Sequence, residues 1–264
     1  MIPKIIFIVP YRDREYEKHH FSIYMKYLME DYDENDYEIY FSYQCDKRPF
    51  NRGATKNIGF LAIKQKYPDN YKNITLVFND IDTLPLKKNI LNYKTNINIV
   101  KHFYGFNFAL GGIFSIVGSD FEKCNGFPNN WGWGLEDNEM KKRCDKNNIK
   151  INKDIFFNYK DKNIIHIFDN TTKRFVNDDE ISNTKNNNCK DNLDTIKNLE
   201  YNIVNNDIIT NCNNQYIINI TRFNTLLSHD TNNYYIKDIK INNRLYANQR
   251  KKQVFNLFNR YNFR

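Results

Sequence analysis

Apolar positions in the first eighty residues switch between strand-like and helix-like spacing. Residues 4–10 form a continuous apolar run rich in β-branched side chains, as in a strand buried on both faces of a parallel sheet. Residues 16–31 show helical apolar spacing, and residues 37–43 alternate like a strand. We expect a second helix to begin within residues 50–60, before another apolar run at residues 73–78. This β-α-β-α-β order predicts a doubly wound α/β sheet.

The next part of the chain carries shorter patterns. Residues 106–118 are apolar around a pair of adjacent glycines, where the backbone can approach another group closely. Strand-like runs follow at residues 154–159 and 163–168. Residues 170–198 are polar and are expected to be loop-like and partly helical.

We divide the chain into a main domain at residues 1–204 and an extension at residues 205–264. Two short apolar runs with Asn-rich turns fall within residues 201–221. The last twenty residues place apolar side chains at helical spacing among basic ones, namely Val254, Leu257, Phe258 and Tyr261. They predict a helix that is packed on the main domain or that lies on a membrane surface or a partner.

Residues 125–143 join a loop to the start of a helix. Glycines and a proline break regular structure in the first half, whereas helix-forming residues begin at Leu135. Acidic residues fall in the first helical turn and basic residues in the last, which complements the helix dipole. These residues are Glu136, Asp137 and Glu139, and then Lys141, Lys142 and Arg143. A carboxylate at such a helix start is held by backbone N–H groups and kept ionised.

Two tryptophans, Trp131 and Trp133, lie beside these carboxylates. Flat apolar faces next to a fixed carboxylate suit a sugar ring whose hydroxyl must lose a proton. The alternative is a glycine-rich loop followed by an ordinary acidic first turn.

Charged residues also follow the ends of two expected strands. Arg12 and Arg14 come after the first strand, where two guanidinium groups could hold a diphosphate or form a solvated turn. Asp80 and Asp82 follow the strand at 73–78, and strand alternation would point both carboxylates to one side. Hard oxygen ligands there would suit Mg²⁺ or Mn²⁺ bound to a diphosphate.

Composition narrows the function classes. The formal net charge of +8, from 39 basic and 31 acidic residues, favours anionic ligands such as nucleotide phosphates and does not require nucleic acid. The five cysteines include no C-x-x-C pair, so neither a structural zinc site nor a disulfide framework is expected. The first apolar run is too short for a signal peptide or a membrane span. We therefore expect a cytoplasmic protein with reduced thiols and no transmembrane segment.

These motifs, in this order, resemble the β-1,4-galactosyltransferase family of metal-dependent inverting glycosyltransferases. The resemblance covers roughly residues 4–200. The matching segments are Pro10–Arg14, Phe50–Arg52, Asn57–Phe60, Asp80–Asp82, Gly111–Gly112 and Gly126–Asp137, the last being long and specific. The resemblance implies a GT-A fold, which is Rossmann-like with a mixed, mostly parallel central sheet flanked by helices. The main domain would then be the catalytic domain.

The resemblance also implies roles for individual residues. The UDP-sugar donor would be bound by Pro10, Arg12, Arg14, Phe50, Arg52, Asp80, Gly111, Gly112 and Trp133. The metal, Mn²⁺ or alternatively Mg²⁺, would be held by Asp82 and His166, although a histidine in an apolar run is by itself more often a core residue. The catalytic pair would be Asp137, the general base, and Glu136, and the acceptor site would include Trp131, Trp133 and Ala109. A single in-line displacement would invert the anomeric centre.

The sequence departs from the family pattern at three points. Asn163 and Phe168 stand where a further metal ligand would be expected. Ala109 stands where many members have a bulky tyrosine, which leaves room for the N-acetyl group of N-acetylgalactosamine. We also expect the membrane anchor and stem of the family to be absent, which again predicts a cytoplasmic location.

The function predicted from the sequence is therefore transfer of galactose or N-acetylgalactosamine from a UDP-sugar to a hydroxyl of a glycan, glycosylated protein or lipid, forming a β-linkage. Two alternatives remain open. One is a transferase for another UDP-sugar, such as UDP-N-acetylglucosamine, and the other is a catalytically inactive nucleotide- or glycan-binding module.

Overall fold

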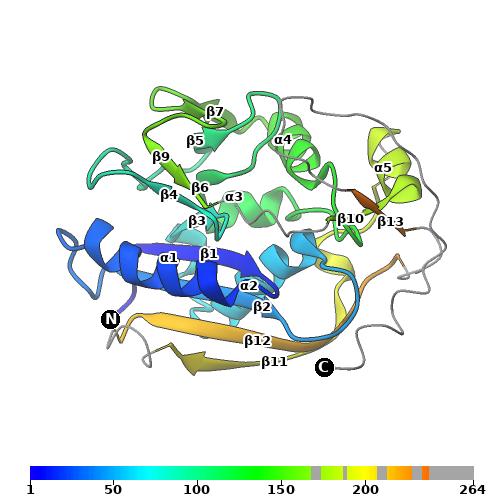
Figure 1. Ribbon diagram of the computed structural model, residues 1–264, viewed down its shortest axis with the longest axis horizontal. Coiled ribbons are helices and arrows are strands. Elements are labelled where there is room, and N and C mark those ends of the chain that lie inside the picture. Colours follow the sequence, from blue (N-terminus) through cyan, green and yellow to red (C-terminus); the bar gives the residue numbers. More distant parts are fainter. Residues whose placement is uncertain (168–173, 187–188, 207–212, 228–233, 238–264) are drawn as a thin grey trace.

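The computed structural model describes residues 1–167, 174–186, 189–206, 213–227 and 234–237 (Figure 1). The helix expected over the last twenty residues lies outside these described residues.

A mixed β-sheet forms the centre of the described structure. Its strands are β1 (Ile5–Tyr11), β2 (Tyr37–Gln44), β3 (Thr75–Asn79), β5 (Ile99–Gly105), β6 (Ile113–Val117), β7 (Lys150–Asn152), β8 (Phe157–Asn158), β11 (Lys197–Asn205) and β12 (Gln215–Asn224). They lie in the order β11-β12-β2-β1-β3-β6-β5-β7, and β8 pairs with β5. The strands β12, β2, β1 and β3 run parallel to one another. Strands β7 and β8 run parallel to β5. Strand β11 is antiparallel to β12, and β6 is antiparallel to both β3 and β5.

Two small sheets and several helices complete the described structure. The small sheets pair β4 (Thr83–Pro85) with β9 (Ile164–His166), and β10 (Arg174–Asn177) with β13 (Tyr234–Lys237). The helices are α1 (Glu15–Leu28), α2 (Arg52–Lys66), α3 (Gly118–Lys123), α4 (Glu136–Lys146) and α5 (Asp178–Lys185), with 3₁₀ turns η1 (Tyr71–Asn73) and η2 (Leu193–Thr195).

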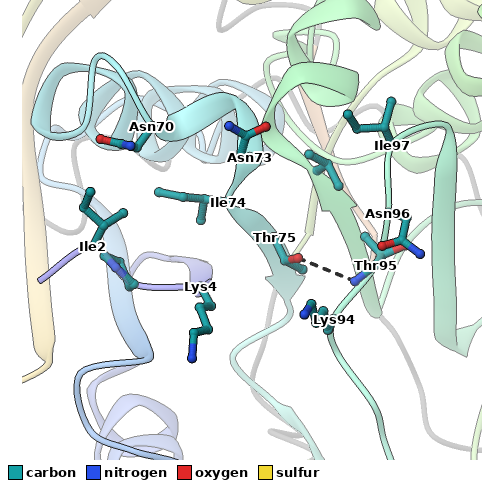
Figure 2. A pocket seen from close by; sticks show the side chains of 12 residues that line it. Ile2, Lys4, Asn70, Asn73, Ile74, Thr75, Lys94, Thr95, Asn96 and Ile97 are labelled. Carbon is teal, nitrogen blue, oxygen red and sulfur yellow. Dashed lines mark hydrogen bonds between the residues drawn. The ribbon is translucent and has the colours of Figure 1, made fainter.

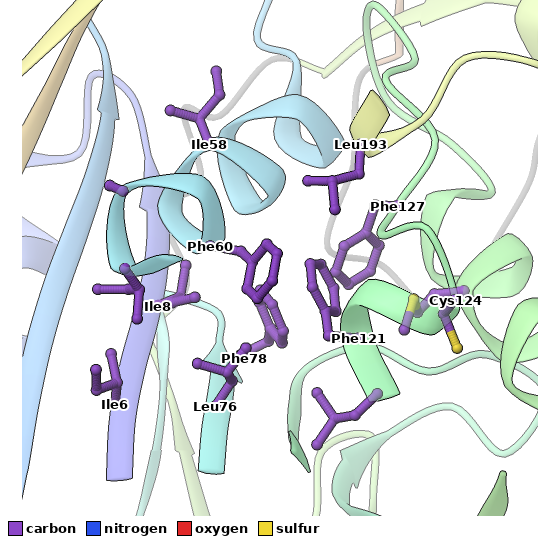
Figure 3. Close-up of a cluster of buried hydrophobic side chains, with 14 of the residues drawn as sticks. Ile6, Ile8, Ile58, Phe60, Leu76, Phe78, Phe121, Cys124, Phe127 and Leu193 are labelled. Carbon is purple, nitrogen blue, oxygen red and sulfur yellow. The ribbon is translucent and has the colours of Figure 1, made fainter. Parts of the chain in front are cut away.

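Strand β1 separates two apolar clusters because its side chains alternate between the faces of the sheet. Ile6 and Ile8 point to a cluster that includes Phe60 of α2 and residues of α3 and α4 (Figure 3). Phe7 and Val9 point to the opposite cluster, which α1 covers. Every residue of β1 is buried, as its continuous apolar pattern predicts.

The predicted fold class is confirmed: helices flank a mixed, mostly parallel sheet. Three local predictions differ in detail. The helix that begins after Leu135 continues to Lys146, three residues beyond Arg143. The apolar run at 154–159 contributes only the two-residue strand β8, and the three-residue strand β7 was not predicted because it is short and polar.

Strand β12 lies beyond the predicted domain boundary at residue 204. It pairs in parallel with β2 over residues 215–220, so this part of the predicted extension belongs to the central sheet. The boundary itself stays a prediction. In the part of the chain that the structure describes, no helix has the length and apolar character needed to cross a membrane.

Candidate functional site

The N-terminal turn of α2 brings a guanidinium group among three carboxylates. Asn51 caps the helix by accepting a hydrogen bond from the backbone N–H of Ala54, and Arg52 is the first helical residue. Arg52 Nη1 lies 2.7 Å from Glu136 Oε1 and 2.9 Å from both carboxylate oxygens of Asp137. Its Nη2 donates to Asp80, which follows β3. Three predicted site segments therefore meet at Arg52.

A second cation reaches the same carboxylate one helical turn later. Lys56 Nζ lies 3.0 Å from Asp137 Oδ1, and the Lys56 side chain is only 1% exposed. Burial lowers the pKa of Lys56, and the repulsion of Arg52 lowers it further, while the nearby carboxylates oppose both effects. Lys56 was not predicted as a site residue. The available signal was its i+4 spacing from Arg52 on one face of the same helix.

The carboxylate of Asp137 is held ionised by these two cations. Burial favours its neutral form, but the charges of Arg52 and Lys56 and their hydrogen bonds outweigh burial and lower the pKa of Asp137. In turn, the three carboxylates outweigh burial and raise the pKa of Arg52 well above its ordinary value. The predicted cause of the ionised state, backbone N–H groups at the helix start, is wrong, because the cations of α2 dominate.

Two adjacent glycines let Asp137 lie against the backbone. A Cβ at Gly111 would lie 2.2 Å from Asp137 Oδ2, and a Cβ at Gly112 would lie 2.4 Å from the Tyr104 carbonyl oxygen. Gly112 also has φ +70, a conformation that favours glycine. The expected close approach at this pair is therefore found. The groups that approach the glycines are the Asp137 carboxylate and the Tyr104 carbonyl oxygen.

The bend at these glycines is supported by a buried histidine. His102 Nε2 lies 3.0 Å from the Gly111 oxygen and 3.1 Å from the Tyr104 oxygen, so this nitrogen carries the proton and donates to both carbonyls. Burial lowers the pKa of His102 to about 4, which keeps the ring neutral. His102 was not predicted as part of the site.

Buried asparagines fix the loop between α3 and α4. Asn57 donates to the Phe127 oxygen and to Asn129 Oδ1, both at 2.8 Å, and accepts from the Phe127 N–H. Asn51 donates to the Asn129 oxygen at 2.8 Å, and Asn129 donates to Asp191 Oδ1 at 2.7 Å. The loop that precedes the candidate base is thus attached to α2, which carries both cations.

The residues expected to bind the diphosphate lie where β1 ends. Pro10 is buried within β1, and Arg12 follows it at the edge of the sheet where β3 also ends. Arg12 Nε lies 3.3 Å from Asp13, and its Nη1 is buried without a hydrogen-bond partner among the described residues. Arg14 donates to Glu17 at 2.6 Å.

Two residues predicted to bind the donor, Phe50 and Arg52, contact other parts of the protein. Phe50, half-buried, precedes α2, and its oxygen accepts a hydrogen bond from the Gly132 N–H at 3.3 Å. Arg52 itself is engaged with carboxylates, so binding a diphosphate would require it to change partners.

Asp82 and His166 face each other across the small β4–β9 sheet. His166 Nε2 lies 3.6 Å from Asp82 Oδ2, and Tyr104 Oη lies 3.2 Å from His166 Nδ1. Residues 80–82 form a turn, and Asp80 pairs with Arg52 while Asp82 faces His166, so the alternation argument for these two carboxylates does not apply. Asn163, one candidate for a further ligand, donates its side-chain amide to Asp161. Phe168, the other candidate, lies outside the described residues.

The three residues predicted for the acceptor site differ in environment. Trp131 is 2% exposed, stacks on Phe223 and donates from its indole N–H to Thr225 at 2.9 Å. Trp133 is half-buried, and Ala109 is buried next to the Gly111 bend. Trp131 therefore packs against the end of β12, and a role in acceptor binding remains a prediction for all three.

Two surface hollows lie away from this cluster. One, of about 350 Å³, lies at the opposite end of the sheet, where β1 and β3 begin (Figure 2). It is lined by residues that include Lys4, Asn73 and Thr75. The other, of about 460 Å³, lies between α2 and β11 and includes Gln65 and Tyr201. Neither contains a predicted site residue.

Two family models match adjacent parts of the chain. The model described as the N-terminal region of glycosyl transferase group 7 matches residues 2–95, and the model described as the N-terminal domain of galactosyltransferase matches residues 93–168. Together they span more than half of the 264 residues and include every predicted site residue.

Curated relatives match just over half of the chain. β-1,4-Galactosyltransferase 1 of Bos taurus is 29% identical over 149 residues, which is 53% of this chain and 36% of the relative. Xylosylprotein 4-beta-galactosyltransferase of Caenorhabditis elegans is 31% identical over 146 residues, covering 52% and 48%. β-1,4-Galactosyltransferase 4 of Mus musculus is 31% identical over 170 residues, covering 58% and 45%. The chain spans less than half the length of these relatives.

Solved structures extend the likeness to the fold. The catalytic domain of Drosophila β-1,4-galactosyltransferase 7 in complex with xylobiose superimposes with a TM-score of 0.67 at 26% identity, covering 83% of this chain and 94% of that one. A mutant of the same Drosophila enzyme, in complex with manganese, UDP-Gal and xylobiose, gives 0.66 over the same coverage. With the motifs, the GT-A architecture and the family models in agreement, the chain belongs to the β-1,4-galactosyltransferase family.

Proposed function

We propose that this chain is an inverting glycosyltransferase that moves galactose or N-acetylgalactosamine from a UDP-sugar to a hydroxyl of a glycan or glycoconjugate, forming a β-linkage. The observation that carries the proposal is the ionised carboxylate of Asp137, held by Arg52 and Lys56 against Gly111. A fixed, ionised carboxylate beside a guanidinium group that can bind phosphate is what proton removal next to a departing diphosphate requires.

The chemistry is a single displacement. Asp137 takes the proton of the acceptor hydroxyl while that oxygen bonds to the anomeric carbon, and the bond from this carbon to UDP breaks with its electron pair leaving on the diphosphate. Because attack comes from the face opposite the leaving group, the configuration inverts. Arg12 supports the diphosphate assignment, since its buried Nη1 has no hydrogen-bond partner among the described residues and an anionic oxygen would satisfy it.

Asp82 and His166 are the residues proposed to hold a metal ion. The fit is supported by the 3.6 Å separation of a carboxylate oxygen and an imidazole nitrogen, a donor set that suits Mn²⁺. No cluster of three or more such ligands occurs among the described residues, so diphosphate and water oxygens would supply the remaining positions. A bound ion would act as a Lewis acid that neutralises charge on the leaving diphosphate. Tyr104 orients the His166 ring through Nδ1.

The donor sugar and the acceptor are proposed from the size of one side chain and from a solved relative. Ala109, which is buried beside the Gly111 bend, has a small side chain that favours room for an N-acetyl group, so we propose N-acetylgalactosamine together with galactose. A Drosophila relative was solved with UDP-Gal and xylobiose, which supports galactose transfer to a saccharide hydroxyl. The cytoplasmic location remains a prediction of the sequence.

The test is UDP release from a panel of UDP-sugars with Mn²⁺ and with a chelator. We expect release from UDP-galactose or UDP-N-acetylgalactosamine, lost with the chelator, and its stimulation by a saccharide acceptor. In Asp137→Asn, turnover should fall by roughly 10²- to 10⁴-fold while UDP binding is retained. Release mainly from UDP-N-acetylglucosamine would favour the alternative donor. UDP binding without turnover in the parent chain would favour the inactive binding module, and unchanged turnover in Asp137→Asn would contradict the assignment of the base.

A further inference from the structure

Lys56 and Arg52 hold the carboxylate of Asp137 in different ways. Arg52 Nη1 lies 2.9 Å from both Oδ1 and Oδ2, whereas Lys56 Nζ contacts Oδ1, at 3.0 Å. The Lys56 ammonium also lies 4.3 Å from the centre of the Phe127 ring, so aromatic and carboxylate partners surround it.

The two cations also differ in their freedom to change partners. The Arg52 side chain is 17% exposed and is shared with Glu136 and Asp80, and its planar fork matches a diphosphate. The Lys56 side chain is 1% exposed on the interior face of α2. If Arg52 turns to a bound diphosphate, Lys56 remains on Asp137.

We infer that Lys56 is the positioning residue for Asp137: it holds Oδ1 and leaves Oδ2 to take the proton of the acceptor hydroxyl. This inference rests on the proposed function. When a donor binds and Arg52 turns to its diphosphate, Arg52 releases Oδ2. Binding of the donor thereby exposes the base. The balance of the displacement is unchanged, because Lys56 only orients the carboxylate and takes no part in the proton transfer.

The charges that face Asp137 set the direction of the expected changes. The cations are Arg52 and Lys56 from α2. The carboxylates are Glu136 from the helix of Asp137 and Asp80, which Arg52 also contacts. The titratable group His102, which contacts the Gly111 oxygen, is neutral. Removing the Lys56 charge leaves one cation beside Asp137. The pKa of Asp137 should therefore rise.

The experiment compares Lys56→Met with Lys56→Arg in the full chain. Methionine keeps an unbranched apolar side chain against Phe127 without the charge, and arginine restores the charge. The matched control is Lys64→Met, on the same helix, where the lysine pairs with Glu122 at 2.5 Å. The carboxyl carbon of Asp137 is titrated by ¹³C NMR, and the pH dependence of kcat and the donor KM are measured with the active UDP-sugar.

We expect the Asp137 midpoint and the acidic limb of kcat to move to higher pH in Lys56→Met. We also expect kcat to fall by about 10- to 100-fold with little change in donor KM. Lys56→Arg should restore most of kcat, and Lys64→Met should behave as the parent. If the parent is active and Lys56→Met has the same Asp137 titration midpoint as the parent, or the same pH profile of kcat, this inference alone would be overturned. A parent that neither binds UDP nor releases it from any donor would instead overturn the proposed function.

Discussion

At the scale of single residues, the candidate base depends on a missing side chain as much as on the two cations. Asp137 can lie against residue 111 only because that residue is glycine. A Cβ there would approach its Oδ2 to 2.2 Å and its Cγ to 2.6 Å. An alanine side chain at position 111 must therefore displace the carboxylate from Gly111 and from Lys56.

We predict that Gly111→Ala lowers kcat by about 10²-fold or more, because a displacement of about 1 Å is enough to misalign proton transfer. UDP binding, measured by calorimetry, should be retained. Gly118→Ala is the control: its Cβ would meet the Tyr71 oxygen at 2.0 Å, far from the site. It should lower the melting temperature but leave kcat per folded molecule unchanged. Parent-like kcat in Gly111→Ala would contradict this account.

The buried His102 predicts how stability depends on pH. An unfolded histidine titrates near pH 6.5, whereas His102 in the folded protein titrates at about 4. Between these values the unfolded state binds more protons, so stability is lost as the pH falls from 6.5 to 4 and no further below that. Between pH 7 and 4.5 the His102 contribution should amount to about 2 to 3 kcal/mol.

The measurement is urea unfolding of the parent and of His102→Gln at pH 7, 5.5 and 4.5. Glutamine keeps an N–H donor for the carbonyls of Tyr104 and Gly111 but does not titrate. The free energy of unfolding should therefore fall less steeply with acid in the variant. Parallel pH profiles for the two chains would exclude His102 as the source.

At the scale of elements, the loop before α4 is held to α2 by amide side chains. Asn129 is fully buried and exchanges hydrogen bonds with Asn51, Asn57 and Asp191. Because α2 carries Arg52 and Lys56, the same contacts set the distance between the cations and the helix that bears Asp137. Buried polar partners of this kind are costly to leave unpaired.

We predict that Asn129→Ala lowers the free energy of unfolding by about 3 kcal/mol, since Asp191 and the Asn57 amide each lose a buried partner. Asn35→Ala is the control, because Asn35 is exposed and donates to Asp33 at the surface. Its effect should stay within about 0.5 kcal/mol. Denaturant unfolding checks both variants, and equal values for the two would show that the asparagine network does not hold the loop.

At the scale of the whole molecule, β12 joins the C-terminal part of the described chain to the core of the sheet. It hydrogen-bonds β2 on one side and β11 on the other, and Ile218, Ile220 and Phe223 are fully buried. Strand β2 would become an unprotected edge without it. The region beyond residue 204 therefore contributes to the main sheet and not only to an appendage.

We predict that a chain ending at residue 206 loses cooperative unfolding and aggregates, whereas a chain ending at residue 237 keeps all described strands and unfolds cooperatively. Circular dichroism in urea and size-exclusion chromatography compare the two. A chain ending at residue 206 with the unfolding midpoint of the parent would support the predicted boundary at residue 204.

The sequence alone determined the elements whose signal is local. The buried strand β1, the helix α1, the start of α2 within residues 50–60 and the loop-to-helix transition before Asp137 all follow from patterns within a few residues. The position of Arg12 and Asp80 at strand ends follows too, because parallel strands end at one edge of a sheet.

Only the tertiary structure decided which groups meet. Arg52 contacts carboxylates 28 and 85 positions away, Lys56 turns inward to Asp137, and His102 supports Gly111 across a bend. Trp131 stacks on Phe223, a contact that its motif does not predict, and its role at the acceptor stays a prediction. These contacts join segments whose sequence patterns are independent of one another. A spacing rule describes one helix or strand, whereas partner choice depends on how the sheet and helices bring distant segments together.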